Sequence, residues 1–130
     1  MDRPLIDGLT PADVSRYTEG NCAQLAAELL RLAGWPMRAL SEPHWPHRPI
    51  YHVFSECAPG VYLDAKGTWT ASEIASYYGW PDWIVIETSE EDLKAWRWQG
   101  GWYGDEVRLS AVVRILVNHA HVSSSPVLSS

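Results

Sequence analysis

Residues 22–33 constrain the fold more than any other segment, because a strong helical pattern there has clear signals at both ends. Asn21 or Thr18 can cap the start, and Gly34 and Pro36 end the helix. One helix face is apolar and must be buried against another element. The apolar residues at helical spacing are Cys22, Leu25, Ala26, Leu29 and Ala33. The cysteine lies beside the free N–H groups of the first turn, where a thiolate is favoured.

A predicted hairpin supplies a histidine and an aspartate. Residues 50–54 have the pattern of a strand and contain His52. Residues 58–60 are typical of a turn, and the returning strand at 61–65 contains Asp64. Both side chains can therefore approach the cysteine at the helix start, provided that the hairpin presents them on one face.

The helix alone is too weak to ionise a thiol at neutral pH. A helix terminus contributes roughly 0.3 to 1 kcal/mol to a nearby charge, which lowers a thiol pKa by well under one unit. A thiol with an ordinary pKa of about 8.5 needs a decrease of two units or more, and a neighbouring imidazolium is the usual source. His52 is the candidate for that role. Asp64 on the adjacent strand is suited to fix the tautomer and orientation of the imidazole.

The register of the hairpin decides whether such a triad can exist. If Glu56 opposes Val61 across a four-residue turn at 57–60, the numbers of paired residues add up to 117, and His52 and Asp64 point to opposite faces. A slip of one residue or a bulge near the turn changes that sum to 116 or 118 and brings both side chains to one face. The triad hypothesis therefore requires an even sum.

Three short sequence words occur in the order Cys, His, Asp. They are Gly20-Asn21-Cys22 followed by Leu25-Ala26, then His52-Val53-Phe54, then Tyr62-Leu63-Asp64-Ala65 followed by Gly67. In these words the chain resembles the papain-like cysteine peptidase superfamily, and in particular small, largely uncharacterised papain-fold proteins of bacteria and their phages. The resemblance covers about the first two thirds of the chain.

The resemblance implies an α+β fold in which the N-terminal helix that bears the nucleophile packs on a small antiparallel sheet, with further short helices. It also implies that Cys22 is the nucleophile, His52 the general base and Asp64 the orienting residue, without a cofactor. The cathepsin-type sequence around the nucleophile and a clear upstream glutamine are absent. Asn21 or the backbone N–H of Cys22 is therefore the expected oxyanion donor.

The rest of the sequence predicts a single papain-like α+β domain over residues 1–122 and a mobile, serine-rich tail at 123–130. Within the domain, residues 1–11 are expected to form an extended arm. Further predicted elements are a short helical turn at 11–17, a helix at 70–78, a buried strand at 83–87, a short acidic helix from 88 toward Trp98, and a helix at 105–119.

Composition limits the partners and the compartment. A formal net charge of −6 and the absence of a Lys/Arg cluster argue against direct nucleic-acid binding, which depends on phosphate contacts. The sequence shows no signal-peptide pattern and no run of about 18 apolar residues that could span a membrane. We therefore expect a cytoplasmic protein without membrane contact, in which Cys22 and Cys57 are free thiols.

Two other interpretations of the same residues stay open. Cys22 can be an ordinary buried cysteine, with His52 a packed histidine and Asp64 a turn residue. The second alternative is a zinc site at the same three side chains, although no histidine pair has a familiar zinc spacing. We predict no metal; the additional candidate ligands for zinc are His44, His47, His119 and His121.

The loop before the histidine strand is the predicted border of a substrate or partner cleft. It contains His44, Trp45 and His47, and Trp45 is the expected anchor because a partly exposed indole offers a large apolar area. One function class is a thiol enzyme that acts on an amide bond of a protein or peptide, as a peptidase, deamidase or acyl transferase. The alternative is a non-catalytic acidic binding or inhibitor protein, of a kind that phages encode, which occupies a basic surface of a host or defence protein.

Overall fold

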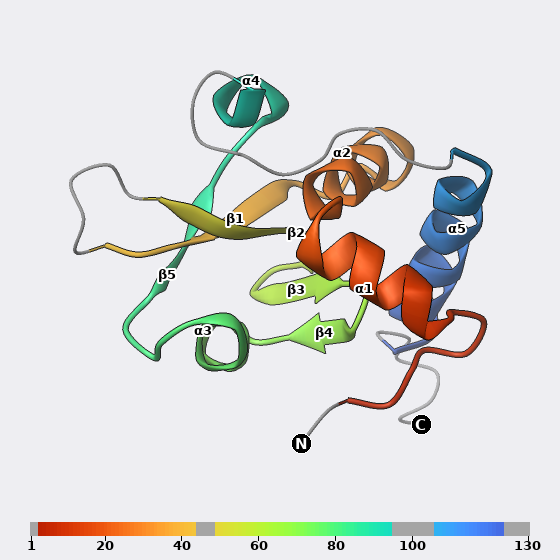
Figure 1. Cartoon of the computed structure of the whole chain (residues 1–130), viewed down its shortest axis with the longest axis horizontal. Helices are drawn as coiled ribbons and strands as arrows, with labels where there is room; N and C mark the ends of the chain where they lie inside the picture. Colours follow the sequence, from red (N-terminus) through yellow and green to blue (C-terminus); the bar gives the residue numbers. More distant parts are fainter. Residues whose placement is uncertain (1–2, 44–48, 95–105, 124–130) are drawn as a thin grey trace.

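A five-stranded antiparallel sheet with the strand order β4-β3-β2-β1-β5 lies at the centre of the computed structural model (Figure 1). The structure describes residues 3–43, 49–94 and 106–123. The strands are β1 (Met37–Ser41), β2 (Ile50–Ala58), β3 (Val61–Asp64), β4 (Gly67–Trp69) and β5 (Ile84–Glu87). The helices within the described ranges are α1 (Pro11–Glu19), α2 (Cys22–Ala33), α3 (Ala71–Tyr78), α4 (Glu90–Asp92) and α5 (Glu106–Ser123). The predicted α+β class is confirmed.

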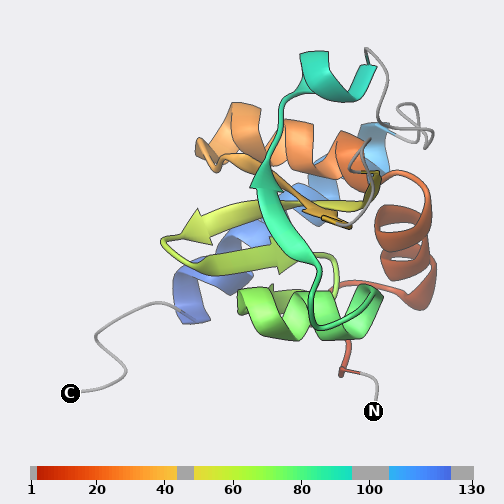
Figure 2. The same cartoon turned by 90° about the vertical axis from the view of Figure 1, so that its left-hand side faces the viewer.

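Helices cover both faces of the sheet. Helix α2 packs against β1 and β2, and α1 and α5 pack against α2. Helix α3 lies on the opposite side, against β3, β4 and β5, and Figure 2 shows it well separated from α2. Alternate strand residues serve the two faces, because Ala39 and Val53 are buried with α2, whereas Leu40 and Phe54 are buried with α3. The sheet therefore carries an apolar core on each side.

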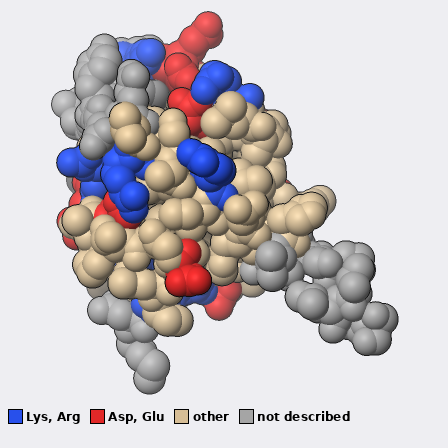
Figure 3. All heavy atoms as spheres, turned by 90° about the vertical axis from the view of Figure 1, so that its right-hand side faces the viewer, with Lys and Arg blue, Asp and Glu red and all other residues tan. Residues whose placement is uncertain are grey.

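Charged side chains of both signs are interspersed on the face over α5 (Figure 3). Within the molecule, Arg108 of α5 donates from Nε to Oδ1 of Asp13 in α1 at 2.8 Å. This hydrogen bond outweighs the effect of burial and lowers the pKa of Asp13 to about 2. The ion pair joins the first and last helices of the described chain.

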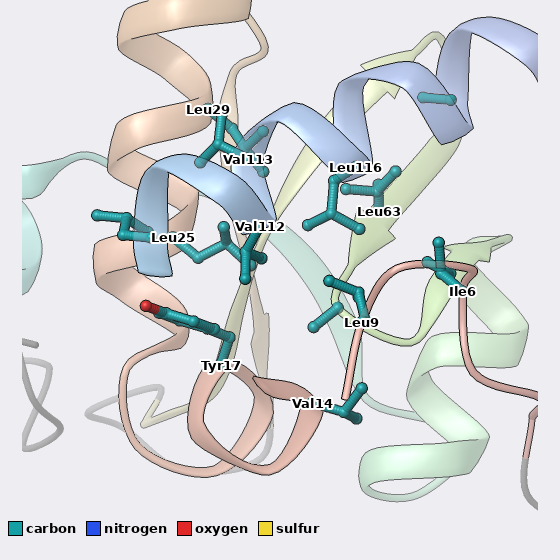
Figure 4. Packing of buried hydrophobic residues seen from close by; sticks show 13 residues of the cluster. Ile6, Leu9, Val14, Tyr17, Leu25, Leu29, Leu63, Val112, Val113 and Leu116 are labelled. Atoms are coloured by element: carbon teal, nitrogen blue, oxygen red, sulfur yellow. The ribbon is translucent and has the colours of Figure 1, made fainter. Parts of the chain in front are cut away.

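The segment before α1 belongs to the core. Ile6 and Leu9 are buried together with Leu63 and Leu116, and Figure 4 shows these side chains facing one another. Burial of one such side chain contributes roughly 1.5 to 3 kcal/mol. The expected extended arm at 1–11 is thus corrected for residues 3–10, since part of it packs against β3 and α5.

The hairpin of β2 and β3 has an even register. Ser55 pairs with Leu63, so the numbers of the paired residues add up to 118. The strands are joined by a two-residue turn at 59–60, not by the four-residue turn at 57–60 used for the simple odd register. The register also shifts by one residue just after Glu56. This irregularity is the kind of bulge that the triad hypothesis requires.

The helices of the structure agree with the predicted ones except for differences at their ends. Helix α2 ends at Gly34 in the left-handed conformation, but the side chain of Asn21 makes no cap hydrogen bond. Helix α1 continues to Glu19, beyond the short turn expected at 11–17. Helix α3 begins with the predicted capping box of Thr70, and α5 confirms the helical interpretation of residues 105–119 where these are described.

The strand predictions are less complete. Strands β1 and β4 were not predicted from the sequence. Strand β5 is an edge strand with half-exposed side chains, where a buried strand was expected. Ile84, for example, is 39% exposed. The acidic helix expected from residue 88 is limited to Glu90–Asp92 in the described chain, and its predicted end near Trp98 lies outside the described residues.

Gly79, which follows α3, lies against the ring of Trp83. A Cβ at position 79 would be 2.0 Å from Cε3 of Trp83, and this indole stacks on Tyr51 with 4.5 Å between ring centroids. We expect Gly79→Ala to displace the indole and to lower the free energy of unfolding by about 1 to 3 kcal/mol, measured by urea titration. Gly20→Ala is the control, because a Cβ at Gly20 would come no closer than 3.9 Å to another atom. Equal losses in both variants would contradict the steric explanation.

Candidate active site

Cys22 is the first residue of α2 and is buried, with 2% of its surface exposed. It packs in a cluster that contains residues of α2, β1 and β2. Nδ2 of the neighbouring Asn21 donates to Oε1 of Gln24 at 3.0 Å. The side chain of Asn21 does not cap the helix. The N–H groups of the first turn are thus left uncapped by this side chain, and that of Cys22 is one of them.

His52 and Asp64 meet because the even register places them on one face of the hairpin. Nε2 of His52 lies 2.8 Å from Oδ2 of Asp64, and each residue is 1% exposed. The recorded pairing of β2 with β3 ends at Ser55 and Leu63. The two side chains therefore join the strands beyond the last paired backbone positions.

Asp64 accepts four hydrogen bonds, two on each carboxylate oxygen. Oδ2 accepts from Nε2 of His52 at 2.8 Å and from the hydroxyl of Tyr78 at 2.6 Å. Oδ1 accepts from Nε1 of Trp69 at 2.9 Å and from the backbone N–H of Lys66 at 2.8 Å. A carboxylate offers about four lone-pair sites, so these donors fill its capacity. The orientation of Asp64 is fixed as a result.

The electrostatics of the pair favour an imidazolium beside a carboxylate. Burial alone would lower the pKa of His52, but the hydrogen bonds and charges of Asp64 and Cys22 outweigh burial and raise it to about 9. Burial would raise the pKa of Asp64, yet the hydrogen bonds from His52, Tyr78 and Trp69 hold it below its usual range. Both shifts follow from the same contact between opposite charges.

The sulfur of Cys22 lies within interaction range of His52, since both its hydrogen bonding and its charge contribute to the raised pKa of the imidazole. Among the described residues, however, Nδ1 of His52 has no partner with ordinary hydrogen-bond geometry. Because Nε2 is taken by Asp64, Nδ1 is the nitrogen left for the sulfur. Hydrogen bonds between catalytic groups are often long or poorly aligned before substrate binds.

The site is closed to solvent in this conformation. Cys22, His52 and Asp64 are each exposed by 2% or less, and Leu93 after α4 is fully buried in the cluster that contains Cys22. A cavity of about 490 Å³ lies elsewhere, between the end of α2, the hairpin and α5. Its lining includes Trp35 but none of the three site residues. A molecule in solvent can reach the sulfur only after some of the side chains packed around Cys22 move.

The predicted cleft border falls on residues 44–47. His44, Trp45 and His47 lie outside the described residues. The described ranges contain no group of three or more His, Cys, Asp or Glu side chains that could hold a metal ion. His119 and His121 both belong to α5.

Two residues of the site were missed by the sequence analysis, namely Tyr78 and Trp69. Both donate to Asp64 through a polar atom on an aromatic ring. A buried carboxylate needs such donors, and Tyr and Trp combine a donor with an apolar body. That requirement was a usable signal, but the chain has six Tyr and eight Trp, and the pattern does not indicate which of them face Asp64.

Comparison with protein-family models, with curated proteins and with solved structures finds no match to this chain. The described helices include none that is both long and apolar enough to cross a membrane. The assignment of a function therefore depends on the geometry of the site.

Proposed function

We propose that this chain is a papain-like thiol enzyme that acts on an amide bond of a protein or peptide, as a peptidase, deamidase or acyl transferase. The observation that carries the proposal is the buried pair of His52 and Asp64 beside a cysteine at a helix start. A packed structural histidine is satisfied by any hydrogen-bond partner and does not need a charged one. An imidazole that must carry a proton next to a thiolate does.

In the proposed reaction the Cys22 thiolate attacks the carbonyl carbon of the amide and forms a C–S bond. The backbone N–H of Cys22 stabilises the oxyanion. The proton on His52 passes to the leaving nitrogen as the C–N bond breaks, which leaves an acyl thioester and a neutral amine. Water or an amine then attacks the thioester, and His52 takes its proton. This second step releases the product and restores the starting pair.

Asp64 orients His52 in this scheme and does not transfer a proton. Its two oxygens already accept four hydrogen bonds, and its pKa lies below the usual range. The bond to Nε2 also selects the tautomer of the neutral imidazole in which Nδ1 is unprotonated and faces the sulfur. The two free thiols fit a reducing compartment, so we place the enzyme in the cytoplasm.

Alkylation by iodoacetamide tests whether Cys22 is activated. Because the sulfur is buried with Leu93, we use Leu93→Ala to open the cover. In this variant we expect Cys22 to react about tenfold or more faster than Cys57 at pH 6, as measured by mass spectrometry of the two peptides. Cys57 is a suitable reference, because burial and the charge of Glu56 raise the pKa of its thiol.

Two controls separate activation from unfolding. Leu109→Ala removes a buried leucine from a different core cluster, so it destabilises the protein without opening the cover of Cys22. If Leu109→Ala exposes Cys22 as strongly as Leu93→Ala, the reaction reports global unfolding. Equal rates for Cys22 and Cys57 in folded Leu93→Ala at pH 6 would contradict the enzyme proposal.

A second candidate function is the acidic binding or inhibitor protein, and a surface feature favours it. Trp80 is 67% exposed and Tyr51 is 48% exposed, near the edge strand whose Ile84 is also exposed. Aromatic side chains are enriched at protein interfaces. In this case Cys22→Ser would fold and keep its biological activity, whereas the enzyme would lose it. Circular dichroism with a functional assay separates the two proposals.

A further inference from the structure

Tyr78 makes contact with two members of the triad at once. Its hydroxyl donates to Oδ2 of Asp64 at 2.6 Å, and its ring lies 4.0 Å from the ring of His52, centroid to centroid, with 31° between the planes. Burial, and then the charge of Asp64, raise the pKa of Tyr78 far above its ordinary range. The side chain is therefore a phenol, and a donor, at neutral pH.

The oxygen that accepts from Tyr78 is the same one that accepts from His52. Oδ2 of Asp64 lies between the two donors, at 2.6 Å and 2.8 Å. Rotation of the carboxylate would break both bonds together, in addition to the two bonds on Oδ1. The phenol of Tyr78 therefore helps to hold Oδ2 of Asp64 in the position where it accepts from Nε2 of His52.

The end of α3 holds Tyr78 in place. The ring centroid of Tyr78 is 5.6 Å from that of Trp69 and 4.9 Å from that of Tyr77. The next residue, Gly79, lies directly against the indole of Trp83 and leaves no space for a side chain. That indole stacks in turn on Tyr51, the neighbour of His52 in β2. Aromatic contacts thus fix the end of α3 relative to the histidine strand.

We infer that Tyr78 is a positioning residue of the proposed enzyme, which aligns Asp64 with His52 through its hydroxyl and covers the imidazole with its ring. This inference deepens the proposed function and depends on it for its catalytic meaning. The contacts that carry it are nevertheless independent of any reaction, so they can be tested separately.

The groups around Asp64 define what a pH-dependent test reports. The titratable groups that face it are His52 of β2, Tyr78 of α3 and, beyond His52, Cys22 of α2. Two cations lie one layer out, where the guanidinium of Arg3 is 3.6 Å from the ring of Trp69 and the ammonium of Lys66 is 5.3 Å from that of Tyr77. Neither cation is among the leading causes of the lowered pKa of Asp64.

The test uses Tyr78→Phe, which keeps the ring and removes the hydroxyl. Proton NMR follows the exchange with water of the Nε2–H of His52, assigned by its loss in His52→Gln. We expect exchange to become about tenfold faster in Tyr78→Phe, as for loss of a hydrogen bond worth about 1.4 kcal/mol. The matched control is Tyr77→Phe, which removes a hydroxyl from the adjacent tyrosine. The backbone amide of Val53, in the β1–β2 ladder, reports any global loss of stability.

A second readout is the pH profile of Cys22 alkylation, recorded in the Leu93→Ala background. Because the bond from Tyr78 lowers the pKa of Asp64, its removal should move the acid limb of the profile to higher pH. A purely structural role would leave this limb in place.

The outcomes distinguish the two proposals. Faster exchange at His52 in Tyr78→Phe, with unchanged exchange at Val53 and in Tyr77→Phe, supports the positioning role. Unchanged exchange at His52 in Tyr78→Phe overturns it, whatever Cys22 does. If uncovered Cys22 is no more reactive than Cys57, the enzyme proposal fails, while the NMR result still decides whether Tyr78 aligns the buried pair.

Discussion

Replacement of Asp64 by alanine is expected to lower the free energy of unfolding by about 3 to 5 kcal/mol, because it leaves a buried charge and several donors without a partner. The donors that lose their acceptor belong to His52, Tyr78, Trp69 and the backbone of Lys66. Urea unfolding at neutral pH, followed by circular dichroism, measures the loss. The same variant should also lower the pKa of His52, since Asp64 is a main cause of its increase.

Two further variants serve as a control and as an intermediate case for the stability lost in Asp64→Ala. Asp7→Ala removes an exposed aspartate and should change stability by about 0.5 kcal/mol or less. Asp64→Asn keeps the shape and one acceptor oxygen but points an amide N–H₂ at two of the donors. We therefore expect an intermediate loss of about 2 to 3 kcal/mol. A loss below about 1 kcal/mol for Asp64→Ala would mean that the carboxylate is not the centre of the network.

The sequence predicted the part of the site that depends on local patterns. The helical stripe and the Gly34 stop placed Cys22 at a helix start, and the strand patterns of 50–54 and 61–65 around a turn placed His52 and Asp64 on paired strands. Whether the two side chains share a face then depends on whether the numbers of the paired residues add up to an even number. The structure answers that question with pairs adding up to 118. The catalytic roles of these residues stay a prediction.

The parts that the sequence did not predict depend on contacts between distant segments. Strand β1 has few exposed positions, so it lacks the alternation that reveals a half-exposed strand. Strand β4 has only three residues. Tyr78 reaches Asp64 from across 14 positions of sequence, and a helical pattern says only that it ends a helix. Leu93, which is buried in the same cluster as Cys22, is likewise 71 positions away from it in the sequence.

The burial of Cys22, His52 and Asp64 is another feature that no sequence pattern could indicate. A helix-start cysteine is exposed or covered according to what the rest of the chain places over it, and here Leu93 belongs to the same cluster. For a thiol enzyme, such a cover prevents oxidation and unselective reaction while no substrate is bound. The stability of the cover then sets the rate at which the sulfur becomes available, which is why Leu93→Ala is part of the test of function.

The pH dependence of stability gives the second large effect, and its sign follows from the shifts at the buried pair. The pKa of His52 is raised in the folded protein from 6.5 to about 9. Its contribution to stability is therefore complete below pH 6.5 and is lost as the pH rises through the folded value. The pKa of Asp64 is lowered, so its contribution is present above its unfolded value of about 3.9 and is lost as the pH falls through the folded value. The pair contributes most between about pH 4 and 6.5.

The alkaline limb is best measured in Cys22→Ser, because Asp64 is then the charged partner of His52. The bond to Asp64 remains in this variant and raises the pKa of His52. We expect the free energy of unfolding to fall by about 1 to 3 kcal/mol between pH 6.5 and 9, at no more than about 1.4 kcal/mol per pH unit. The double variant Cys22→Ser/His52→Gln, whose amide does not titrate, should show little change over the same range. A flat profile in Cys22→Ser itself would show that Asp64 does not hold His52 as an imidazolium, and the proposed mechanism would lose its proton donor.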